Sequence, residues 1–166
     1  MKPVEPLLSK NASRQDRKSL PHAIPNWVGN AADFFITINC SPRGKNQLAL
    51  PETASAIERT LLHQQSSGAW WVHMLLLMPD HLHALVSFSH EASLQRTIQN
   101  WKRFLARQEG VVWQRDFFDH RLRNNESLAE KWTYIRNNPV RKGLASTPDE
   151  WPYQWAFPLK SDQPPR

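Results

Sequence analysis

The strongest constraint on the fold is the segment from residue 70 to residue 89, which has the pattern of two consecutive strands. Residues 70–77 form a nearly continuous apolar run, as expected of a buried central strand. Met78-Pro79-Asp80 supplies a turn, and residues 81–89 then read as the next strand. The apolar run is far shorter than the roughly 20 residues that a membrane-spanning helix requires. We therefore expect a β-hairpin at the centre of a soluble domain.

Periodic patterns on both sides of this hairpin predict the neighbouring elements. Apolar residues alternate over residues 34–40, which indicates a strand. Residues 51–65 carry a helical stripe, and a second helical stripe follows Ser93, a residue type that suits a helix N-cap. Residues 111–118 read as a further strand.

A third helix is predicted to begin at a capping box formed by Ser127 and Glu130, and Pro139 should end it near residues 137–138. The order is then strand, helix, strand, strand, helix, strand, helix. A hairpin between two helix-linked strands is the split βαβ arrangement, so we expect a ferredoxin-like α+β fold with an antiparallel sheet. Helices should cover one face of the sheet, with the C-terminal helix near the other.

We expect three parts along the chain: an N-terminal arm over residues 1–31, one domain over residues 32–159 and a flexible tail over residues 160–166. The arm contains several prolines and a basic cluster but no sustained periodicity, which is typical of a segment that orders on a partner. The single cysteine, Cys40, fits a reducing compartment, and the N-terminus lacks the apolar core of a secretion signal. These features favour a cytoplasmic protein, nucleoid-associated if its ligand is DNA.

The excess positive charge is concentrated in one part of the chain. The net charge is +6, and residues 96–142 alone hold 11 basic and 5 acidic residues, which accounts for all of it. Aromatic residues are interleaved with these cations. Cations neutralise phosphates and flat rings stack on unpaired bases, so the stretch suits a nucleic acid. The alternative is a solvated basic surface over a tryptophan-rich core.

His81 and His83 are two residues apart in a predicted strand, so their side chains leave the same face of the sheet. Leu82 and Ala84 point to the other face, which we take as the core. Two imidazoles side by side, with one side open, can begin a divalent metal site. The alternative is two polar histidines on a half-solvated strand.

Tyr134 lies on the predicted third helix, roughly 120–160° around from the apolar stripe that includes Leu128 and Ile135. A tyrosine serving the core would lie on that stripe. Asn138, four residues later, shares its face, so the helix offers a hydroxyl and an amide one turn apart. The alternative is an exposed tyrosine beside the end of the helix.

Four motifs in this order and spacing resemble those of one protein family. Met78-Pro-Asp-His-Leu-His-Ala84 resembles the histidine–hydrophobe–histidine (HUH) motif of single-strand DNA nucleases, and Tyr134-Ile-Arg-Asn-Asn-Pro-Val-Arg-Lys-Gly143 resembles the motif that holds their catalytic tyrosine. Phe117-Phe-Asp-His-Arg-Leu-Arg-Asn124 and Glu150-Trp-Pro-Tyr153 resemble signatures of one branch, the REP-associated tyrosine transposases of bacteria. The resemblance runs from about Ala32 to Trp155.

This resemblance implies that the chain cuts and rejoins single-stranded DNA at repetitive extragenic palindromes (REP elements), which form hairpins. It implies that Tyr134 is the nucleophile, that a 5′-phosphotyrosine intermediate forms, and that His81 and His83 are catalytic as metal ligands. Asn138 would be the third protein ligand, although the related insertion-sequence enzymes carry glutamine at that position. A mixed nitrogen and oxygen shell suits Mg²⁺ or Mn²⁺.

We expect the basic residues around these motifs, and His120, to contact the DNA. These residues are Arg14, Arg17, Lys18, Arg96, Arg103, Arg107, His120, Arg121, Arg123, Arg136 and Arg141. For His120, a structural role is an equal alternative.

Two other functions compete with this interpretation. The first is a non-catalytic module that binds hairpin DNA or RNA on the same scaffold. The second is a small metal-dependent hydrolase that uses the histidine pair without a covalent step. Tyr153 is a competing nucleophile, although its aromatic surroundings favour packing. The site could be built by a monomer or a homodimer, with the tyrosine helix supplied by the same chain or by its partner.

Overall fold

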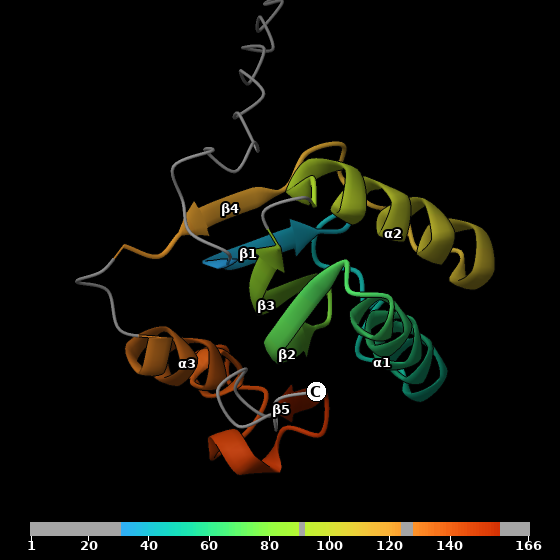
Figure 1. The fold of residues 1–166 in the computed structure, drawn as a ribbon. Helices are drawn as coiled ribbons and strands as arrows, with labels where there is room; N and C mark the ends of the chain where they lie inside the picture. Colours follow the sequence, from blue (N-terminus) through green and yellow to red (C-terminus); the bar gives the residue numbers. More distant parts are fainter. Residues whose placement is uncertain (1–30, 90–91, 124–127, 157–166) are drawn as a thin grey trace, which may run out of the picture.

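The computed structural model describes residues 31–89, 92–123 and 128–156. Within them, five strands form one antiparallel sheet in the order β4-β1-β3-β2-β5 (Figure 1). The strands are β1 (Ala31–Asn39), β2 (Trp70–Met78), β3 (His81–Ser89), β4 (Phe118–Arg121) and β5 (Gln154–Ala156). The helices are α1 (Pro51–Ser66), α2 (Leu94–Glu109), α3 (Leu128–Arg136) and the short α4 (Asn138–Arg141), followed by a 3₁₀ turn, η1 (Pro148–Glu150). The predicted α+β class is confirmed.

Both faces of the sheet are covered. In Figure 1, α1 and α2 lie on one side of the sheet and α3 on the other. The first core packs between the sheet and α1 and α2 and includes Leu82 and Trp101. The second packs under α3 and includes Leu76, Leu85 and Ile135. Cover on both faces explains why β2 is apolar almost throughout.

The helix α2 forms as its pattern predicts. Ser93 caps it, because its Oγ accepts a hydrogen bond from the Arg96 backbone N–H at 3.3 Å. Leu94, Ile98 and Leu105 are buried along one side. Gly110 ends the helix with a φ of +68°, a conformation that favours glycine.

The strand predicted over residues 111–118 is wrong. The strand β4 begins only at Phe118, and the preceding segment touches the sheet through a single bridge between Trp113 and Cys40. Side chains satisfy several of its other backbone groups. The Lys102 ammonium donates to the carbonyls of Gln114 and Arg115, both at 2.8 Å. These two carbonyls therefore have partners although the segment forms no extended ladder.

The third helix ends near the predicted position, at Arg136, and Pro139 then lies in the first turn of α4. Neither α4 nor β5 was predicted. Ser127 of the expected capping box lies outside the described residues, as do the tail and all of the arm except Ala31, which begins β1. Among the helices that the structure describes, none has the length and apolar character to cross a membrane.

Candidate active site

The histidine pair lies on β3, on the face that α3 covers. Register places His83 opposite Thr37 and His81 opposite Asn39 on β1. The two imidazole centroids are 4.9 Å apart and the ring planes are nearly perpendicular. His83 is buried and His81 is half-buried. The prediction that both rings leave the face opposite Leu82 holds in the structure.

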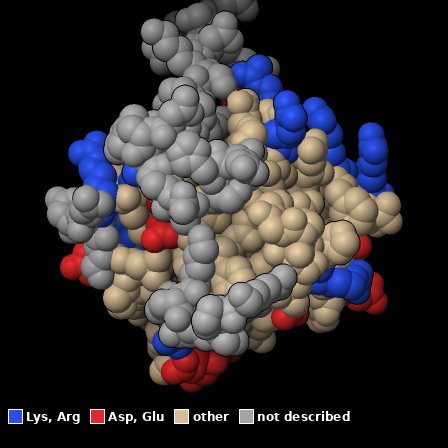
Figure 2. Space-filling view, in the orientation of Figure 1, with Lys and Arg blue, Asp and Glu red and all other residues tan. Residues whose placement is uncertain are grey.

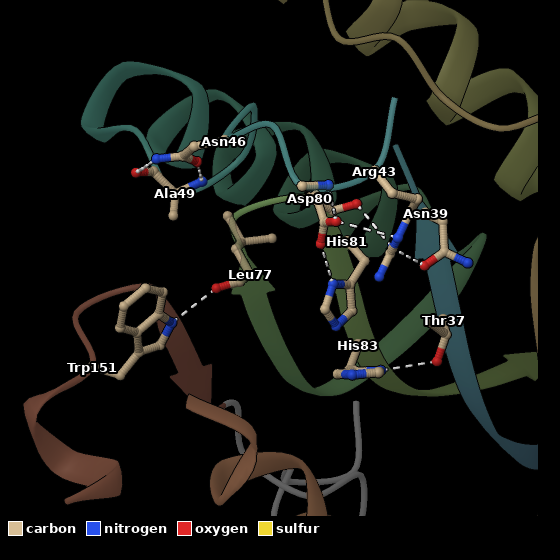
Figure 3. A network of polar contacts seen from close by, with 11 residues as sticks. Thr37, Asn39, Arg43, Asn46, Ala49, Leu77, Asp80, His81, His83 and Trp151 are labelled. Atoms are coloured by element: carbon tan, nitrogen blue, oxygen red, sulfur yellow. Dashed lines mark hydrogen bonds and ion pairs between the residues drawn. The ribbon is translucent and has the colours of Figure 1, made fainter. Parts of the chain in front are cut away.

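Each imidazole is anchored through its Nδ1 atom (Figure 3). His81 Nδ1 is 2.7 Å from Asp80 Oδ1, and His83 Nδ1 is 2.8 Å from Thr37 Oγ1. Among the described residues, neither Nε2 atom has a hydrogen-bond partner. The Asp80 carboxylate can only accept, so it fixes the His81 tautomer that carries Nδ1–H and leaves the Nε2 lone pair open, while the Thr37 hydroxyl orients the His83 ring. The two rings are therefore oriented as metal-ligating histidines usually are.

Asp80 is itself held from two sides. Its Oδ2 accepts a hydrogen bond from the Gly44 backbone N–H at 2.6 Å and pairs with Arg43 Nε at 3.2 Å. Arg43 also donates to the side chain of Asn39. Burial alone would raise the pKa of Asp80, but the hydrogen bonds from Gly44 and His81 and the charge of Arg43 lower it below 3.8. The carboxylate therefore stays ionised while it orients His81.

Both imidazoles are neutral at pH 7. Burial lowers the pKa of His83 to about 3, assisted by the charges of His81, Arg141 and Arg43. Burial also lowers the pKa of His81, although the hydrogen bond to Asp80 opposes the shift. Metal ligation requires neutral imidazole, so the histidine pair meets this condition without losing protons.

Asn138, the predicted third ligand, is less suited to bind a divalent ion than the two histidines are. Asn138 Nδ2 donates to the carbonyls of Tyr134 and Ile135 at 3.4 and 3.2 Å, which defines which side-chain atom is the oxygen. That oxygen accepts a hydrogen bond from Arg141 at 2.8 Å. One lone pair of Asn138 Oδ1 is thus already used. Within the described residues, no group of three or more His, Cys, Asp or Glu side chains could hold a metal.

Tyr134 projects from α3 toward this face of the sheet, one aromatic ring away from His83. Its ring meets Phe35 edge-on at 6.2 Å between centroids, and Phe35 stacks on His83 at 5.5 Å. The Arg141 guanidinium lies over the Tyr134 ring, 4.2 Å from its centroid, and also donates to the Tyr134 carbonyl at 3.3 Å. The tyrosine side chain remains 49% exposed. Its ring is thus held on two sides and open on the others.

A pocket of about 430 Å³ opens beside Tyr134. Phe35 and Phe118 supply apolar walls, and His120 and Lys131 supply polar and cationic groups. His120 reaches this pocket because it pairs with Phe35 across β4 and β1. The pocket therefore offers rings and cations next to a hydroxyl.

The other predicted DNA contacts are scattered over the fold. Arg96, Arg103 and Arg107 lie on the outer side of α2, across the sheet from His81 and His83. Arg136 pairs with Asp149. The other predicted contacts on the described chain are Arg121, at the end of β4, and Arg123, just beyond it. Arg14, Arg17 and Lys18 lie outside the described residues.

Sequence reasoning did not assign functional roles to Thr37, Asp80, Phe35 or Arg43. Asp80 could have been found, because it directly precedes His81 and a histidine ligand commonly has a carboxylate partner. Thr37 and Phe35 lie on β1 and reach the site through the strand register, whereas Arg43 follows β1 and reaches it by pairing with Asp80. Tyr153 packs against the core and meets Trp151 at 5.4 Å between ring centroids, which agrees with a packing role.

The fold and this site define an α+β protein with a histidine pair on the central strand and a tyrosine on a covering helix. No protein-family model matches the chain. A Haemophilus influenzae protein, provisionally named a REP-associated tyrosine transposase, is 27% identical to it, and the match covers 72% of this chain and 77% of that protein. The REP-associated tyrosine transposase of Escherichia coli is 20% identical, with 72% and 73% covered.

Solved structures show the same fold. A REP-associated tyrosine transposase bound to a REP hairpin superposes with a TM-score of 0.67 and 19% identity, over 75% of this chain and 76% of that one. A provisionally named transposase from Deinococcus radiodurans gives a TM-score of 0.50 and 16% identity, over 69% and 95%. The resemblance that the motifs indicated is thereby confirmed, since the curated homologues carry that family's name.

Proposed function

We propose that this chain is a transposase that cleaves and rejoins single-stranded DNA at REP hairpins. Homology to the REP-associated tyrosine transposases supports the transposase role, and a relative of the same fold was solved with a REP hairpin. One observation carries the finer assignment. Both histidines are anchored through Nδ1, neither Nε2 has a hydrogen-bond partner in the part of the chain that the structure describes, and Tyr134 lies one ring away on the same face. A protein with this ligand would be associated with the nucleoid.

In this proposal His81 and His83 would hold Mg²⁺ or Mn²⁺ through Nε2, and the second lone pair of Asn138 Oδ1 would be the third protein ligand. The ion would polarise the scissile phosphate as a Lewis acid. Asp80 keeps His81 in the ligating tautomer, and Thr37 Oγ1 orients the His83 ring through its Nδ1.

Tyr134 acts as the nucleophile. Its oxygen forms a bond to phosphorus as the bond from phosphorus to the 3′-oxygen breaks. The phenol loses its proton, the departing 3′-oxygen gains one, and a 5′-phosphotyrosine remains. Attack by a second 3′-hydroxyl reverses this step and joins a different pair of ends. One phosphodiester replaces another, so the reaction needs no nucleotide hydrolysis.

The pocket beside Tyr134 would hold the nucleotide next to the scissile phosphate. An unpaired base can stack on Phe118, which is 45% exposed, and His120 and Lys131 line the same pocket and would contact its phosphate. Holding this nucleotide would align phosphorus with the Tyr134 hydroxyl.

The test is cleavage of a labelled REP-type hairpin that carries single-stranded flanks, in the presence of Mn²⁺, on a denaturing gel. We expect the wild type to release a shortened strand and to form a protein-bound one. The variants Tyr134→Phe, His81→Ala and His83→Ala should do neither, and a chelator should stop the wild type. Tyr153→Phe is the matched control and should retain cleavage.

Cleavage by Tyr134→Phe would contradict the assignment of the nucleophile. Hairpin binding without cleavage under any metal condition would instead identify a binding module. A free 5′-phosphate product without any protein-bound strand would identify a hydrolase.

A further inference from the structure

The pocket beside Tyr134 contains a histidine from the strand β4. His120 pairs with Phe35 across β4 and β1, and both residues line this pocket of about 430 Å³ together with Tyr134. The Tyr134 ring meets Phe35 edge-on at 6.2 Å between centroids, so His120 and Tyr134 adjoin the same phenylalanine from two different elements. Strand register therefore brings this imidazole to the pocket of the proposed nucleophile.

His120 is the one titratable residue of β4 on the face that α3 covers. Successive residues of a strand point to opposite faces. Asp119 and Arg121 pair with Ile36 and Phe34, whose side chains lie in the core under α1 and α2. Both therefore leave the face opposite to that of His120. His120 itself is half-buried, which leaves part of its surface to the pocket that it lines.

Nucleophilic attack by Tyr134 requires a proton acceptor. The hydroxyl proton has to leave the phenol as its oxygen bonds to phosphorus, because a neutral phenol is a weak nucleophile. Histidine is the side chain that most readily takes up and returns a proton near neutral pH. It can do so directly or through one water molecule. His120 is the residue of this type that shares the pocket with Tyr134.

The two histidines of the proposed metal site have other partners (Figure 3). The Nδ1 atom of His81 is bonded to Asp80 Oδ1, at 2.7 Å. The Nδ1 atom of His83 is bonded to Thr37 Oγ1, at 2.8 Å. The metal would take both Nε2 atoms, which leaves neither ring a nitrogen for the phenol. The second oxygen of Asp80 accepts from the Gly44 N–H at 2.6 Å, so this carboxylate is also engaged.

The other described residues that line the pocket cannot accept the proton. Phe35 and Phe118 have no polar side-chain atom, and the Lys131 ammonium only donates hydrogen bonds. The row of Lys and Arg side chains that Figure 2 shows along the upper right lies where Figure 1 places α2, across the sheet from α3. Lys131 and Tyr134 are thus the charged and titratable groups that share the described lining with His120.

We propose that His120 accepts the proton of the Tyr134 hydroxyl during strand cleavage and returns it during joining. This inference rests on the proposed function, which supplies the nucleophile and the scissile phosphate. In cleavage, the phenol proton moves to an imidazole nitrogen as the phenol oxygen bonds to phosphorus. The bond from phosphorus to the 3′-oxygen breaks, its electron pair stays on that oxygen, and the solvent protonates it.

The imidazolium that forms serves the second half of the reaction. It is a cation in the pocket, so it can contact the phosphate of the nucleotide held there. When a second 3′-hydroxyl attacks, that hydroxyl loses its proton to the solvent and the bond from the Tyr134 oxygen to phosphorus breaks. The imidazolium then returns its proton to the phenolate. His120 is neutral again at the end of the cycle.

The test measures the single-turnover rate of covalent adduct formation at saturating hairpin DNA and Mn²⁺, over a range of pH. We expect the wild-type rate to rise with pH and level off once His120 is neutral, because only a neutral imidazole accepts a proton. His120→Ala should lower the rate at neutral pH about 100-fold, a usual contribution of a general base. Its rate should keep rising with pH as hydroxide takes over, and added imidazole should restore part of it.

His120→Gln separates proton transfer from a DNA contact. Glutamine still hydrogen-bonds to phosphate but cannot take up the proton, so the rate should remain low. Hairpin affinity, measured by fluorescence anisotropy, should stay within about threefold of the wild type for both variants. His63→Ala is the matched control, because His63 is exposed on α1 on the other side of the sheet, and its rate should equal that of the wild type.

Circular dichroism melting checks that each variant is folded, and His120→Gln carries the test if His120→Ala is not. A wild-type rate in His120→Gln, or a slow rate that keeps the wild-type pH profile and gains nothing from imidazole, would overturn the proposal. Loss of hairpin affinity with an unchanged rate at saturation would make His120 a DNA contact instead. Each of these results leaves attack by Tyr134 standing. No adduct from the wild type under any condition would contradict the proposed function itself.

Discussion

Arg141 shows how a residue's place in the fold changes the interpretation of its charge. The sequence suggested a phosphate contact. In the structure its guanidinium covers the Tyr134 ring at 4.2 Å and donates to Asn138 Oδ1 at 2.8 Å. An arginine that is stacked and hydrogen-bonded in this way fixes the position of its neighbours and is less available to contact a phosphate. We therefore interpret Arg141 as a positioning residue for the tyrosine.

Replacing Arg141 by Met should lower the rate of covalent adduct formation at saturating DNA about tenfold or more, because small displacements of a nucleophile are costly. Hairpin affinity should stay within about threefold. Arg141→Lys keeps the charge but not the stacked plane and should recover little. Single-turnover kinetics and anisotropy measure the two quantities separately.

The control for Arg141 is Arg136→Met, which removes a cation that pairs with Asp149 instead. Its adduct rate should match that of the wild type. If Arg141→Met weakens hairpin binding while the adduct rate at saturation is unchanged, Arg141 is a phosphate contact and the positioning role is wrong.

Asp80 provides a second prediction for a single residue. Asp80→Asn keeps a hydrogen-bond acceptor for His81 but removes the negative charge that makes the imidazole a better ligand. We expect Mn²⁺ affinity, measured by titration calorimetry without DNA, to fall about 10- to 100-fold. Asp149→Asn, another carboxylate in an arginine pair, should leave it unchanged. Equal Mn²⁺ affinity in Asp80→Asn and the wild type would show that Asp80 does not support metal binding.

Among the elements, those defined by local pattern could be predicted and those defined by distant partners could not. The hairpin of β2 and β3 and the helix α2 follow from alternation, a helical stripe and a cap that are all local. Residues 111–117 have strand-like composition, but Lys102 and Gln47 satisfy part of their backbone. Those partners are up to 65 residues away in sequence, so no local pattern reveals them. The strand β5 has three residues, too few for periodicity.

The contact between Lys102 and the 110–115 segment can be tested by its effect on stability. Lys102→Met leaves two carbonyls without their donor and should lower the free energy of unfolding by about 1–3 kcal/mol, the cost of losing hydrogen bonds to a charged group. Denaturant unfolding measures this change. Arg103→Met, at the exposed neighbouring position, should change stability by less than about 0.5 kcal/mol.

The contribution of Lys102 to the free energy of unfolding depends on pH, and the direction of this dependence follows from its pKa. Burial lowers the pKa of Lys102 below 10.5, and Asp116 only partly opposes the shift. Between the lowered value and 10.5, the unfolded chain binds more protons than the folded one, so this residue makes stability rise with pH. Lys102→Met should reduce that slope in the alkaline range. A slope equal to that of the wild type would contradict the buried, charged lysine.

In the whole molecule, the sheet separates the residues predicted to act in catalysis or to contact DNA into two sets. The histidine pair, Tyr134 and His120 share the face under α3, whereas the arginines of α2 lie on the other side. The sequence predicts that His81 and His83 share a face because strand alternation is local. It could not assign faces across elements, since packing and register decide them. DNA that contacts both sets must therefore pass around the sheet.

The most direct measurement of the central claim is the identity of the residue that carries the DNA. The wild type is incubated with flanked hairpin and Mn²⁺, digested with nuclease and protease, and the nucleotide-modified peptide is sequenced by mass spectrometry. The chain has two tyrosines, so the result distinguishes between them. We predict a nucleotide 5′-phosphate on Tyr134. Attachment at Tyr153, or strand cleavage with no modified tyrosine, would contradict the account.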